Sequence, residues 1–479
     1  MTNQTQKKRL IKELTKELSS NNLAIFAGAG LSVESGFVNW SGLMEDVAIE
    51  LDLDINKETD LVSLAQYHVN SNSDNRSKIN SILIEEFSKN ARITENHKIL
   101  SRLPISIYWT TNYDDIIERS LKDAGKITDV KHDKDQLLTP IKRRDAVVYK
   151  MHGDFTIPAR AVITKDDYER YHIDRGDFLA ALKGYLLTTR FLFLGFSFTD
   201  PNLDYVLSRI RASYGKNQQT HDCILKAVAQ KDEESVADFD YRKRKQELFI
   251  NDLSRVGVKT LLVDDYKEIT EILSEVEKSY KRKTIFISGA ASSFSPFEEK
   301  DAENFIYRLS REINKLGFRI VSGFGLGVGS SVITGVLEEL HMSGGSINDN
   351  QLILRPFPQS STGSSKSIPE LWTEYRKSMI SYSGVSIFIF GNKMDDSGNV
   401  ILSNGIREEF EISKSLGNVL IPIGNTGFIA KELWDEIIAD NPYKDLNRGN
   451  DIFELVKSLD GLADFDETIK KVIGILSLI

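Results

Sequence analysis

The sequence predicts an α/β protein made of two domains, each built on its own set of buried strands. Two observations carry this prediction. Short apolar segments of strand length recur along the chain, and the stretches between them place apolar residues at helical spacing. The pattern breaks once, at a polar and basic connector over residues 277–283, and a fresh series of apolar strands begins at residue 284.

Length and composition point the same way. The chain has 479 residues, more than one hydrophobic core usually organises, so two or three domains are expected. Hydrophobic residues make up 41% and charged residues 27%, which is ordinary for a soluble globular protein. The 61 basic and 70 acidic residues give a net charge of −9, which argues against a broad surface for nucleic acid or for an anionic membrane.

The number of cysteines and the lengths of the apolar runs exclude several classes of protein. Cys223 is the single cysteine, so one chain has neither an internal disulfide framework nor a cysteine-based zinc site, and no metal is expected. The longest apolar runs, at 191–198 and 384–390, are too short to cross a bilayer. The basic start of the chain leads into an amphipathic pattern rather than an apolar block, so a cytoplasmic protein is the simplest expectation.

The first series of elements covers about residues 1–270. A lead-in helix over residues 1–20 precedes the first strand, and helical segments extend from a loop at 36–40 to about residue 100. Strands are predicted at 23–27, 105–110, 147–150, 191–197 and 261–265. They end in glycine, hydroxyl, amide or carboxylate residues, and in open α/β sheets ligands bind beyond the carboxyl ends of the strands. We therefore expect one site where these strand ends converge.

The segment Gly28-Ala29-Gly30-Leu31-Ser32 follows the first strand and is the strongest local signal. Glycine lets the backbone turn sharply and approach a pyrophosphate, whose charge is met by unpaired N–H groups at the start of a helix. Ser32 is placed to cap that helix. Alone, the segment is weak evidence for dinucleotide binding, because strand-to-helix turns often need glycine for packing only.

Two later motifs make the signal specific. Thr111-Asn112-Tyr113-Asp114 and His152-Gly153 follow the glycine segment in the order, and at roughly the spacing, of the sirtuin motifs G-A-G-x-S, T-Q-N-x-D and H-G. The chain from about residue 20 to residue 270 therefore resembles sirtuins. The resemblance implies a Rossmann-like domain with helical insertions that binds NAD and breaks the bond between nicotinamide and ribose.

The residue types suit that chemistry. Asn112 can offer a donor and an acceptor to ribose hydroxyls or to a water. His152 can take a proton near neutral pH from a hydroxyl or from the attacking water. Asp114 either orients the Asn112 turn or stabilises the cation that develops on the ribose. Residues 195–203 resemble the divergent bacterial branch of the family and are expected to contact the adenosine side. The residues expected to hold NAD are Gly28, Ala29, Gly30, Ser32, Gly195, Ser197 and Asp265.

Two departures from the sirtuin pattern change the predicted reaction. Sirtuin deacylases carry two C-x-x-C pairs for a zinc ribbon, which this chain cannot form. After Gly36, the family's P-D-F-R is replaced by Val38-Asn39-Trp40-Ser41, so the arginine is missing. Without the zinc module that helps to build the acyl-peptide groove, water is the natural acceptor, and we predict an NAD hydrolase that releases nicotinamide and ADP-ribose. A protein deacylase or ADP-ribosyltransferase and a non-catalytic nucleotide-binding regulator are the alternatives.

The second series of elements follows the connector. Strands are predicted at 284–288, 318–322, 352–354, 385–390 and 419–423. Alternating glycines at 323–329 come directly after the second of these strands and open a helix, which suits a turn that holds an anion. The turn lacks the lysine of a P-loop. A serine-rich segment, 360–367, is expected to be a mobile loop.

The order of motifs in this half resembles the lysine-decarboxylase-like, or SLOG, nucleotide-binding family. The match implies that Arg376 and Glu408 face the ribose and phosphate of a bound nucleotide. Where the family has P-G-G, this chain has Gly391-Asn392-Lys393 and then an insertion at 394–399, which favours binding a nucleotide without cutting it. The residues implied to bind the signal are Gly289, Gly325, Leu326, Arg355, Arg376, Lys393, Gly405 and Glu408.

The two resemblances combine into one prediction. A zinc-less sirtuin-like domain at residues 1–280 followed by a SLOG domain at residues 284–479 resembles the NAD-consuming effectors of the bacterial Thoeris antiphage system. This implies a C-terminal domain that senses a cyclic ADP-ribose-type signal made by a TIR-domain partner, and an N-terminal domain that then depletes NAD and stops the infected cell. It also implies a homo-oligomer, a tetramer. We expect signal binding to shift a two-state arrangement that opens or assembles the site at His152.

Overall fold

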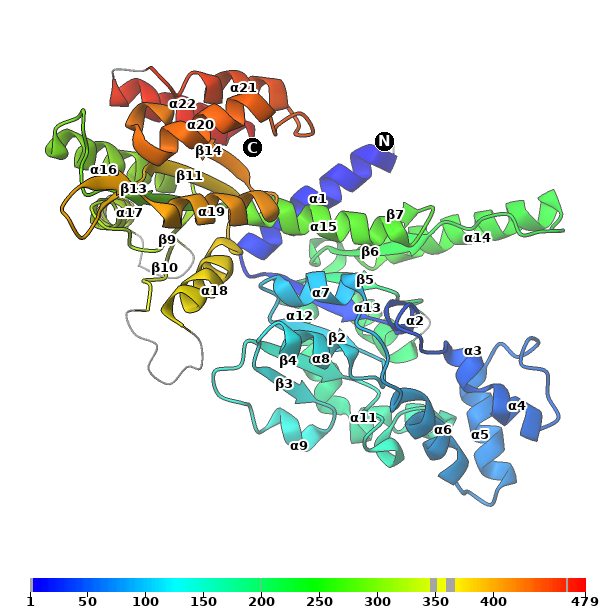
Figure 1. Ribbon diagram of the computed structural model, residues 1–479. Coiled ribbons are helices and arrows are strands. Elements are labelled where there is room, and N and C mark those ends of the chain that lie inside the picture. Colours follow the sequence, from blue (N-terminus) through cyan, green and yellow to red (C-terminus); the bar gives the residue numbers. More distant parts are fainter. Residues whose placement is uncertain (1–2, 199, 345–350, 359–366, 462–463) are drawn as a thin grey trace. The chain divides into compact units, whose positions relative to one another are not determined.

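A computed structural model of the chain describes residues 3–198, 200–344, 351–358, 367–461 and 464–479 (Figure 1). The chain separates into two compact units, Met1–Glu277 and Lys278–Ile479. Helix α15 (Lys267–Lys281) runs through the point of division. The serine-rich segment at 360–367 lies outside the described residues, except for Ser367, whose side chain caps the helix that follows.

The first unit is built on a seven-stranded parallel sheet in the order β3-β4-β2-β1-β5-β6-β7 (Figure 1). Its strands are β1 (Leu23–Ala27), β2 (Ile107–Thr110), β3 (Thr128–Lys131), β4 (Ala146–Lys150), β5 (Arg190–Leu194), β6 (His221–Lys226) and β7 (Val258–Val263). The strands β1, β4 and β5 are buried along their whole length, because helices cover both faces of a parallel sheet.

Helices follow most of these strands, and a separate group of helices lies between β1 and β2 in the sequence. The helices are α1 (Asn3–Ser19), α2 (Ala29–Val33), α3 (Trp40–Leu43), α4 (Glu45–Glu50), α5 (Leu61–Ser71), α6 (Ser77–Phe87), α7 (Glu95–Arg102), α8 (Ile116–Asp123), α9 (Lys134–Leu137), α10 (Lys165–Glu169), α11 (Tyr171–Asp174), α12 (Gly176–Thr188), α13 (Pro201–Tyr214) and α14 (Val236–Arg255).

The helices α3 to α6, in the darker blues of Figure 1, have a hydrophobic cluster of their own. Leu64, Leu83 and Phe87 belong to it, and Tyr113 and Ile163 from the sheet side pack into it. A second cluster fills the space between the sheet and α12–α13. The helical insertions expected in this domain therefore form one cored group beside the sheet.

The second unit is built on a five-stranded parallel sheet in the order β10-β9-β8-β11-β14. Its strands are β8 (Thr284–Ala290), β9 (Arg319–Ser322), β10 (Leu352–Leu354), β11 (Val385–Phe390) and β14 (Val419–Pro422), and a short antiparallel pair is formed by β12 (Asn392–Met394) and β13 (Val400–Leu402). The helices are α16 (Glu299–Lys315), α17 (Gly329–Met342), α18 (Ile368–Ile380), α19 (Asn404–Ser415), α20 (Phe428–Asp440), α21 (Gly449–Lys457) and α22 (Phe465–Leu478). The α/β class predicted for both halves is confirmed.

Two structural absences hold for the residues that the structure describes. Their helices are all too short or too polar to cross a bilayer. Their histidine, cysteine and acidic side chains form no cluster of three or more that could hold a metal ion.

Candidate active site

A cavity of about 530 Å³ lies at the carboxyl ends of four central strands of the first unit, β1, β2, β4 and β5. Most residues predicted to bind NAD or to act on it line this cavity: Ala29, Gly30, Ser32, Asn112, Asp114, His152, Gly195 and Ser197. The opposite wall comes from the α3–α6 group and its loops, through Phe37, Val38, Asn39, Trp40, Leu43, Thr59, Asp60, Leu61, Val62 and Phe87. The cavity therefore has one polar wall of strand ends and one largely apolar wall of helices.

The glycine segment after β1 packs directly on the loop after β5. Gly28 N donates to Leu194 O at 2.9 Å, and Gly30 N donates to Gly195 O at 2.9 Å. Gly195 has a φ of +62°, and a Cβ atom there would overlap the backbone of Gly30 and Leu31. The glycines therefore serve the close approach of two loops, and the N–H groups of Gly28 and Gly30 are already bonded to protein carbonyls rather than free for a pyrophosphate.

Ser32 does not cap the helix that the sequence predicted it to cap. That helix, α2, begins at Ala29 with Gly28 as its N-cap, so Ser32 lies inside it. The hydroxyl instead accepts a hydrogen bond from Asn112 Nδ2 at 3.0 Å. The cap prediction was wrong because the helix starts directly at the glycine turn, with its N-cap four residues earlier than expected.

Asn112 joins the turns after β1 and β2. Its amide nitrogen donates to Gly28 O at 3.1 Å as well as to Ser32 Oγ, and its backbone N–H donates to Thr110 Oγ1 at 2.9 Å. Both amide hydrogens are thus used within the protein, although the sequence suggested a donor for the substrate. The amide oxygen is the atom that Asn112 can offer to a water or to a ribose hydroxyl.

Asp114 is buried at the edge of the cavity, and 4% of its surface is exposed. One carboxylate oxygen accepts a hydrogen bond from Ile116 N at 3.1 Å, at the start of α8. The other oxygen has no hydrogen-bond partner among the described residues. The first contact stabilises the turn into α8, and the two roles predicted for Asp114 stay predictions.

His152 lies at the end of β4, against a carboxylate that the sequence analysis did not pair with it. Its Nε2 atom is 3.0 Å from Asp200 Oδ2, and the two side chains are 4% and 6% exposed. Both atoms are buried, and neither has a hydrogen bond to any other described residue. The ring of Tyr168 stands edge-on to the imidazole, with the centroids 5.4 Å apart.

Asp200 also caps α13, since its Oδ1 accepts a hydrogen bond from Leu203 N at 2.9 Å. Burial opposes ionisation of this carboxyl, but the neighbouring His152 and the N–H groups at the start of α13 outweigh it and hold the pKa of Asp200 below its usual value. The Asp-Pro pair at a helix start is visible in the sequence. The position of Asp200 beside His152 is not visible in the sequence. It depends on how the start of α13, which follows β5, packs against the end of β4.

Lys150, two residues before His152, is a fully buried cation that contacts the turn after β2. Its Nζ donates to the carbonyls of Tyr113 and Asp114 at 3.1 and 2.6 Å, and it forms ion pairs with Asp154 and Glu118. Burial disfavours the charge, but the two carboxylates keep the pKa of Lys150 above its usual value. The strand that delivers His152 is thereby bonded to the turn that carries Asn112 and Asp114.

Asp265 is not among the residues that line the cavity. Its carboxylate accepts a hydrogen bond from Lys267 N at 2.8 Å, and its own N–H donates to Glu268 at 3.1 Å. These contacts organise the start of α15. The contact with NAD expected for this residue rested only on its position at a strand end.

In the second unit, Arg376 and Glu408, which were predicted to face the signal, form an ion pair with each other. Arg376 Nη1 on α18 lies 2.7 Å from Glu408 Oε2 on α19, and its Nε lies 3.3 Å from Glu409 Oε1. Glu409 is buried and accepts a hydrogen bond from Ser288 Oγ at 2.6 Å, which connects the pair to the end of β8. Burial raises the pKa of Glu409 although Ser288 and Arg376 oppose that shift. A Cβ at Gly405 would lie 2.7 Å from the Arg376 guanidinium, so glycine makes room for it.

The glycine loop after β9 packs on the turn after β8. A Cβ at Gly325 would overlap Gly289 O, and Leu326 O accepts a hydrogen bond from Ala291 N at 2.8 Å. Phe357 connects this loop with the ion pair, because its ring lies 5.0 Å from the Arg376 guanidinium and would contact a side chain at Gly323. These contacts connect the elements that carry six of the predicted residues, which are Gly289, Gly325, Leu326, Arg376, Gly405 and Glu408.

The other two predicted signal-binding residues are cations at strand ends. The Arg355 guanidinium lies 5.5 Å from the centroid of the Tyr382 ring and donates to Leu354 O at 3.0 Å. Lys393 is exposed on the short strand β12. The insertion at 394–399 consists of the last residue of β12, Met394, and the turn that leads to β13.

The fold and the site define a protein that joins a SIR2-like domain to a SLOG domain. Residues 106–251 match the SIR2-like domain family, and residues 268–479 match the family described as the Sir2- and TIR-associating SLOG family, STALD.

Relatives match almost the whole chain. The NAD(+) hydrolase ThsA of Bacillus cereus (strain MSX-D12) is 54% identical over 89% of this chain and 88% of the relative. The NAD(+) hydrolase ThsA of Acinetobacter baumannii (strain 532279) is 46% identical, with 91% of each chain covered, and that of Cytobacillus dafuensis is 45% identical over 99% and 97%. The chain belongs to the ThsA family of NAD(+) hydrolases.

Proposed function

We propose that the first unit cleaves NAD in the 530 Å³ cavity and that Asn112 and His152 carry the reaction. The observation that supports this assignment is their meeting in one cavity, together with the glycine segment after β1 and the loop after β5. These residues come from four different strand ends, and a shared cavity is what a nicotinamide riboside would require of them.

The reaction we propose is hydrolysis of the N-glycosidic bond. A water attacks C1′ of the ribose as the bond to nicotinamide breaks, and the electron pair of that bond returns to the pyridinium ring, so nicotinamide leaves neutral. His152 takes the proton from the water as the new C–O bond forms, with Asp200 beside the imidazolium that results. The products are nicotinamide, ADP-ribose and one proton, and NAD is a substrate rather than a resident cofactor.

The remaining residues of the site hold this geometry. Asn112 directs its amide oxygen to the water or to a ribose hydroxyl, since its amide hydrogens are bonded to Gly28 O and Ser32 Oγ. Asp114 orients the turn and places a carboxylate oxygen near the developing positive charge. The helices α3 to α6 close the other side of the cavity and keep bulk water away from the bond being cleaved.

We further propose that the second unit binds a cyclic ADP-ribose-type signal from a TIR-domain partner and that binding activates the first unit. The family description of this unit as TIR-associating and the ion pair between Arg376 and Glu408 support the assignment. Signal binding would shift a two-state arrangement in a homo-oligomer, expected to be a tetramer. The resulting depletion of NAD would be the protein's contribution to antiphage defence.

The test is release of free nicotinamide from NAD by the purified full-length chain, with and without a panel of cyclic ADP-ribose isomers. His152→Ala and Asn112→Ala should each lower the rate by at least about a hundredfold, because each removes a group that acts on the reacting atoms. His172→Ala, on an exposed face of α11, is the matched control and should behave as the unchanged chain does.

Three results would contradict the proposal. Full activity of the His152 variant would remove the imidazole from the mechanism. Nicotinamide release that requires an acylated peptide or an acceptor protein would indicate a deacylase or a transferase. Tight binding of NAD without any product, under all signal conditions, would indicate a regulator that binds nucleotides.

A further inference from the structure

The segment 161–168 lies after β4 in the sequence and includes the first residues of α10. It contacts both the backbone and the imidazole of His152. Val162 N donates to His152 O at 2.8 Å, and Tyr113 Oη donates to Val162 O at 2.6 Å. Tyr168, at the end of the segment, lines the cavity and stands against the imidazole. The position of the histidine therefore depends on where this segment lies.

The glycine of the His152-Gly153 motif allows this packing. Gly153 has a φ of +89°, and a Cβ atom there would lie 3.2 Å from Ala161 Cα and from Arg160 O. A larger residue would push the 161–168 segment away from the strand end. The absence of a side chain at Gly153 thus lets the segment pack directly on the His152-Gly153 motif.

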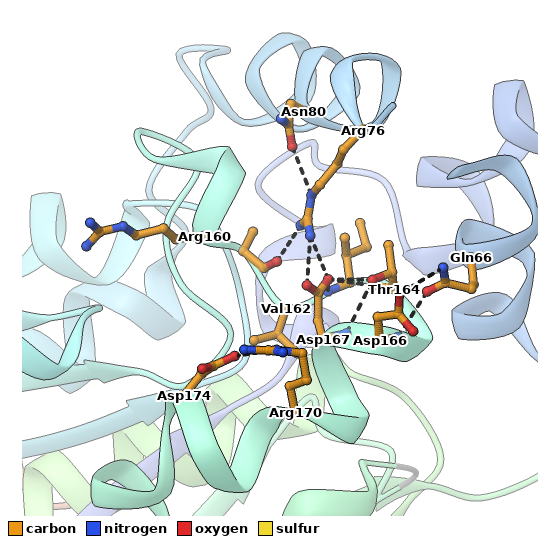
Figure 2. Close-up of polar contacts among 12 residues, drawn as sticks. Gln66, Arg76, Asn80, Arg160, Val162, Thr164, Asp166, Asp167, Arg170 and Asp174 are labelled. Atoms are coloured by element: carbon orange, nitrogen blue, oxygen red, sulfur yellow. Dashed lines mark hydrogen bonds and ion pairs between the residues drawn. The ribbon is translucent and has the colours of Figure 1, made fainter. Parts of the chain in front are cut away.

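An ion pair between Arg76 and Asp167 attaches the segment to the α3–α6 group. Arg76, at the start of α6, donates from Nη1 to both carboxylate oxygens of Asp167, each at 2.8 Å, and from Nη2 to Ala161 O (Figure 2). The Arg76 and Asp167 side chains are 20% and 24% exposed. Because the guanidinium is partly buried and contacts the carboxylate through Nη1 and a backbone carbonyl through Nη2, the pair is stronger than an exposed pair.

Asp167 also binds the backbone of the 161–168 segment. Its Oδ2 accepts hydrogen bonds from Ile163 N at 3.0 Å and from both the N–H and the hydroxyl of Thr164 at 2.8 Å. These bonds form the capping box of α10, which Figure 2 shows next to the Arg76 guanidinium. One carboxylate therefore holds the backbone directly after Val162 and the start of the helix that carries Tyr168.

A second contact runs from α5 to the same place. Asp166 N donates to Gln66 Oε1 at 3.0 Å, and Gln66 Nε2 lies 3.3 Å from Asp166 Oδ2 (Figure 2). Gln66 is buried, with 8% of its surface exposed. The first residues of α5, Leu61 and Val62, and the last residue of α6, Phe87, line the cavity opposite His152. The two contacts therefore connect both walls of the cavity.

We propose that Arg76 and Gln66 are positioning residues for the reaction: through Asp167 and Asp166 they hold the 161–168 segment, and with it His152 and Tyr168, at a fixed place relative to the helical wall. The inference rests on the proposed catalytic role of His152. Neither Arg76 nor Gln66 is among the residues that line the cavity, so their effect is on geometry rather than on contact with NAD.

The experiment compares Arg76→Ala, Arg76→Lys and Gln66→Ala with the control Arg170→Ala. Arg170 forms an exposed pair with Asp174 a few residues further along the chain (Figure 2). Arg76→Ala should lower kcat for nicotinamide release between about tenfold and a hundredfold and change KM by less than about threefold. Arg76→Lys keeps the charge but has no planar guanidinium to reach Asp167 and Ala161 O at once, so its kcat should lie between those of the alanine variant and the unchanged chain. Gln66→Ala should cause a smaller loss of the same kind.

Hydrogen exchange of the 150–168 region provides a second readout. The Val162 amide, which donates to His152 O, should exchange faster in Arg76→Ala and Gln66→Ala but not in the Arg170 control. The inference is overturned if kcat of Arg76→Ala stays within twofold of the unchanged chain while His152→Ala is inactive, or if Arg76→Lys and Gln66→Ala fold and keep full kcat. Full activity of His152→Ala would instead remove the proposed function on which the inference rests.

Discussion

At the scale of single residues, the site depends on buried charges that have a partner of opposite charge. Asp200 lies 3.0 Å from His152, and Lys150 holds the turn of Asp114 while paired with Asp154 and Glu118. A buried charge without such a partner costs several kcal/mol, on the order of 3–5 when one member of a pair is removed. The charged residues around the cavity are therefore parts of its architecture as well as of its chemistry.

Asp200→Asn tests the electrostatic role of this carboxylate. The amide oxygen can still cap α13, so the unfolding free energy should fall by no more than about 1 kcal/mol from the cap. The charge beside His152 is lost, so kcat for nicotinamide release should fall by at least about tenfold with KM little changed. Steady-state kinetics beside thermal denaturation separate the two effects, and an unchanged kcat would show that His152 needs no anionic neighbour.

The same carboxyl gives a pH dependence of known sign. The pKa of Asp200 is lower in the folded chain than its ordinary value of 3.8, so folding favours the ionised form. Its contribution to stability is fully present above pH 3.8 and is lost as the pH falls through the lower folded value.

His97 predicts a loss of stability over a higher pH range. Burial lowers the pKa of His97 from 6.5 to about 4, so the unfolded chain binds a proton that the folded chain refuses between these values. Stability should therefore fall by about 1.4 kcal/mol for each pH unit below 6.5, until about pH 4. His97→Asn should flatten the decline of Tm with pH over this range, and equal slopes for the two chains would contradict the assignment.

At the scale of elements, the apolar strands could be predicted from the sequence and two polar strands could not. β1, β2, β4, β5 and β7 overlap the strands expected in the first half, and all five strands of the second sheet lie where they were expected. β3 and β6 were missed because they carry charges. Asp129 pairs with Lys131 at 2.8 Å and Asp222 with Arg190 at 2.6 Å, and no periodicity reveals such pairs.

The same distinction applies to the site. Motif order alone was enough to bring Asn112 and His152 together, because parallel strands deliver their ends to one edge. The partners Asp200 and Arg76 come from a helix start and from an inserted helical group, whose packing is set by tertiary contacts. Asp265 and the cap at Ser32 show the reverse case, in which a position next to a strand end carried no information about the contact made.

The close approach of two loops gives a prediction for Gly195. A Cβ atom would overlap the backbone after Gly30 and the residue sits at positive φ, so Gly195→Ala should destabilise the first unit by at least about 2 kcal/mol and reduce nicotinamide release. Gly184→Ala is the matched control, since no atom lies within 4 Å of a Cβ there and its helix, α12, should gain about 0.5–1 kcal/mol. Chemical denaturation measures both, and a Gly195 variant as stable as the unchanged chain would rule out the tight packing.

At the scale of the whole molecule, the proposed function assigns the signal and the reaction to different units. Glu408 contacts Arg376 at 2.7 Å and also accepts a hydrogen bond from Thr373. If these groups bind the signal, Glu408→Ala should raise the concentration of a cyclic ADP-ribose isomer needed for half-maximal activation by at least about tenfold. Glu432→Ala, an exposed carboxylate on α20, is the control.

The measurement is a full titration of nicotinamide release against signal concentration. Identical activation curves for the Glu408 variant and the unchanged chain would place the signal elsewhere. Equal NAD cleavage with and without every isomer in the panel would remove the proposed coupling altogether.

The two walls of the cavity belong to different hydrophobic clusters, one under the sheet and one inside the α3–α6 group. A molecule that touches both walls binds the folded chain and not the unfolded one, so it stabilises the fold by mass action. The rise in Tm on adding NAD therefore measures how much of the cavity is occupied, without requiring that NAD be cleaved. In the inactive His152→Ala variant, NAD should still raise Tm on binding. The same measurement could then show which other compounds bind in the cavity without being cleaved.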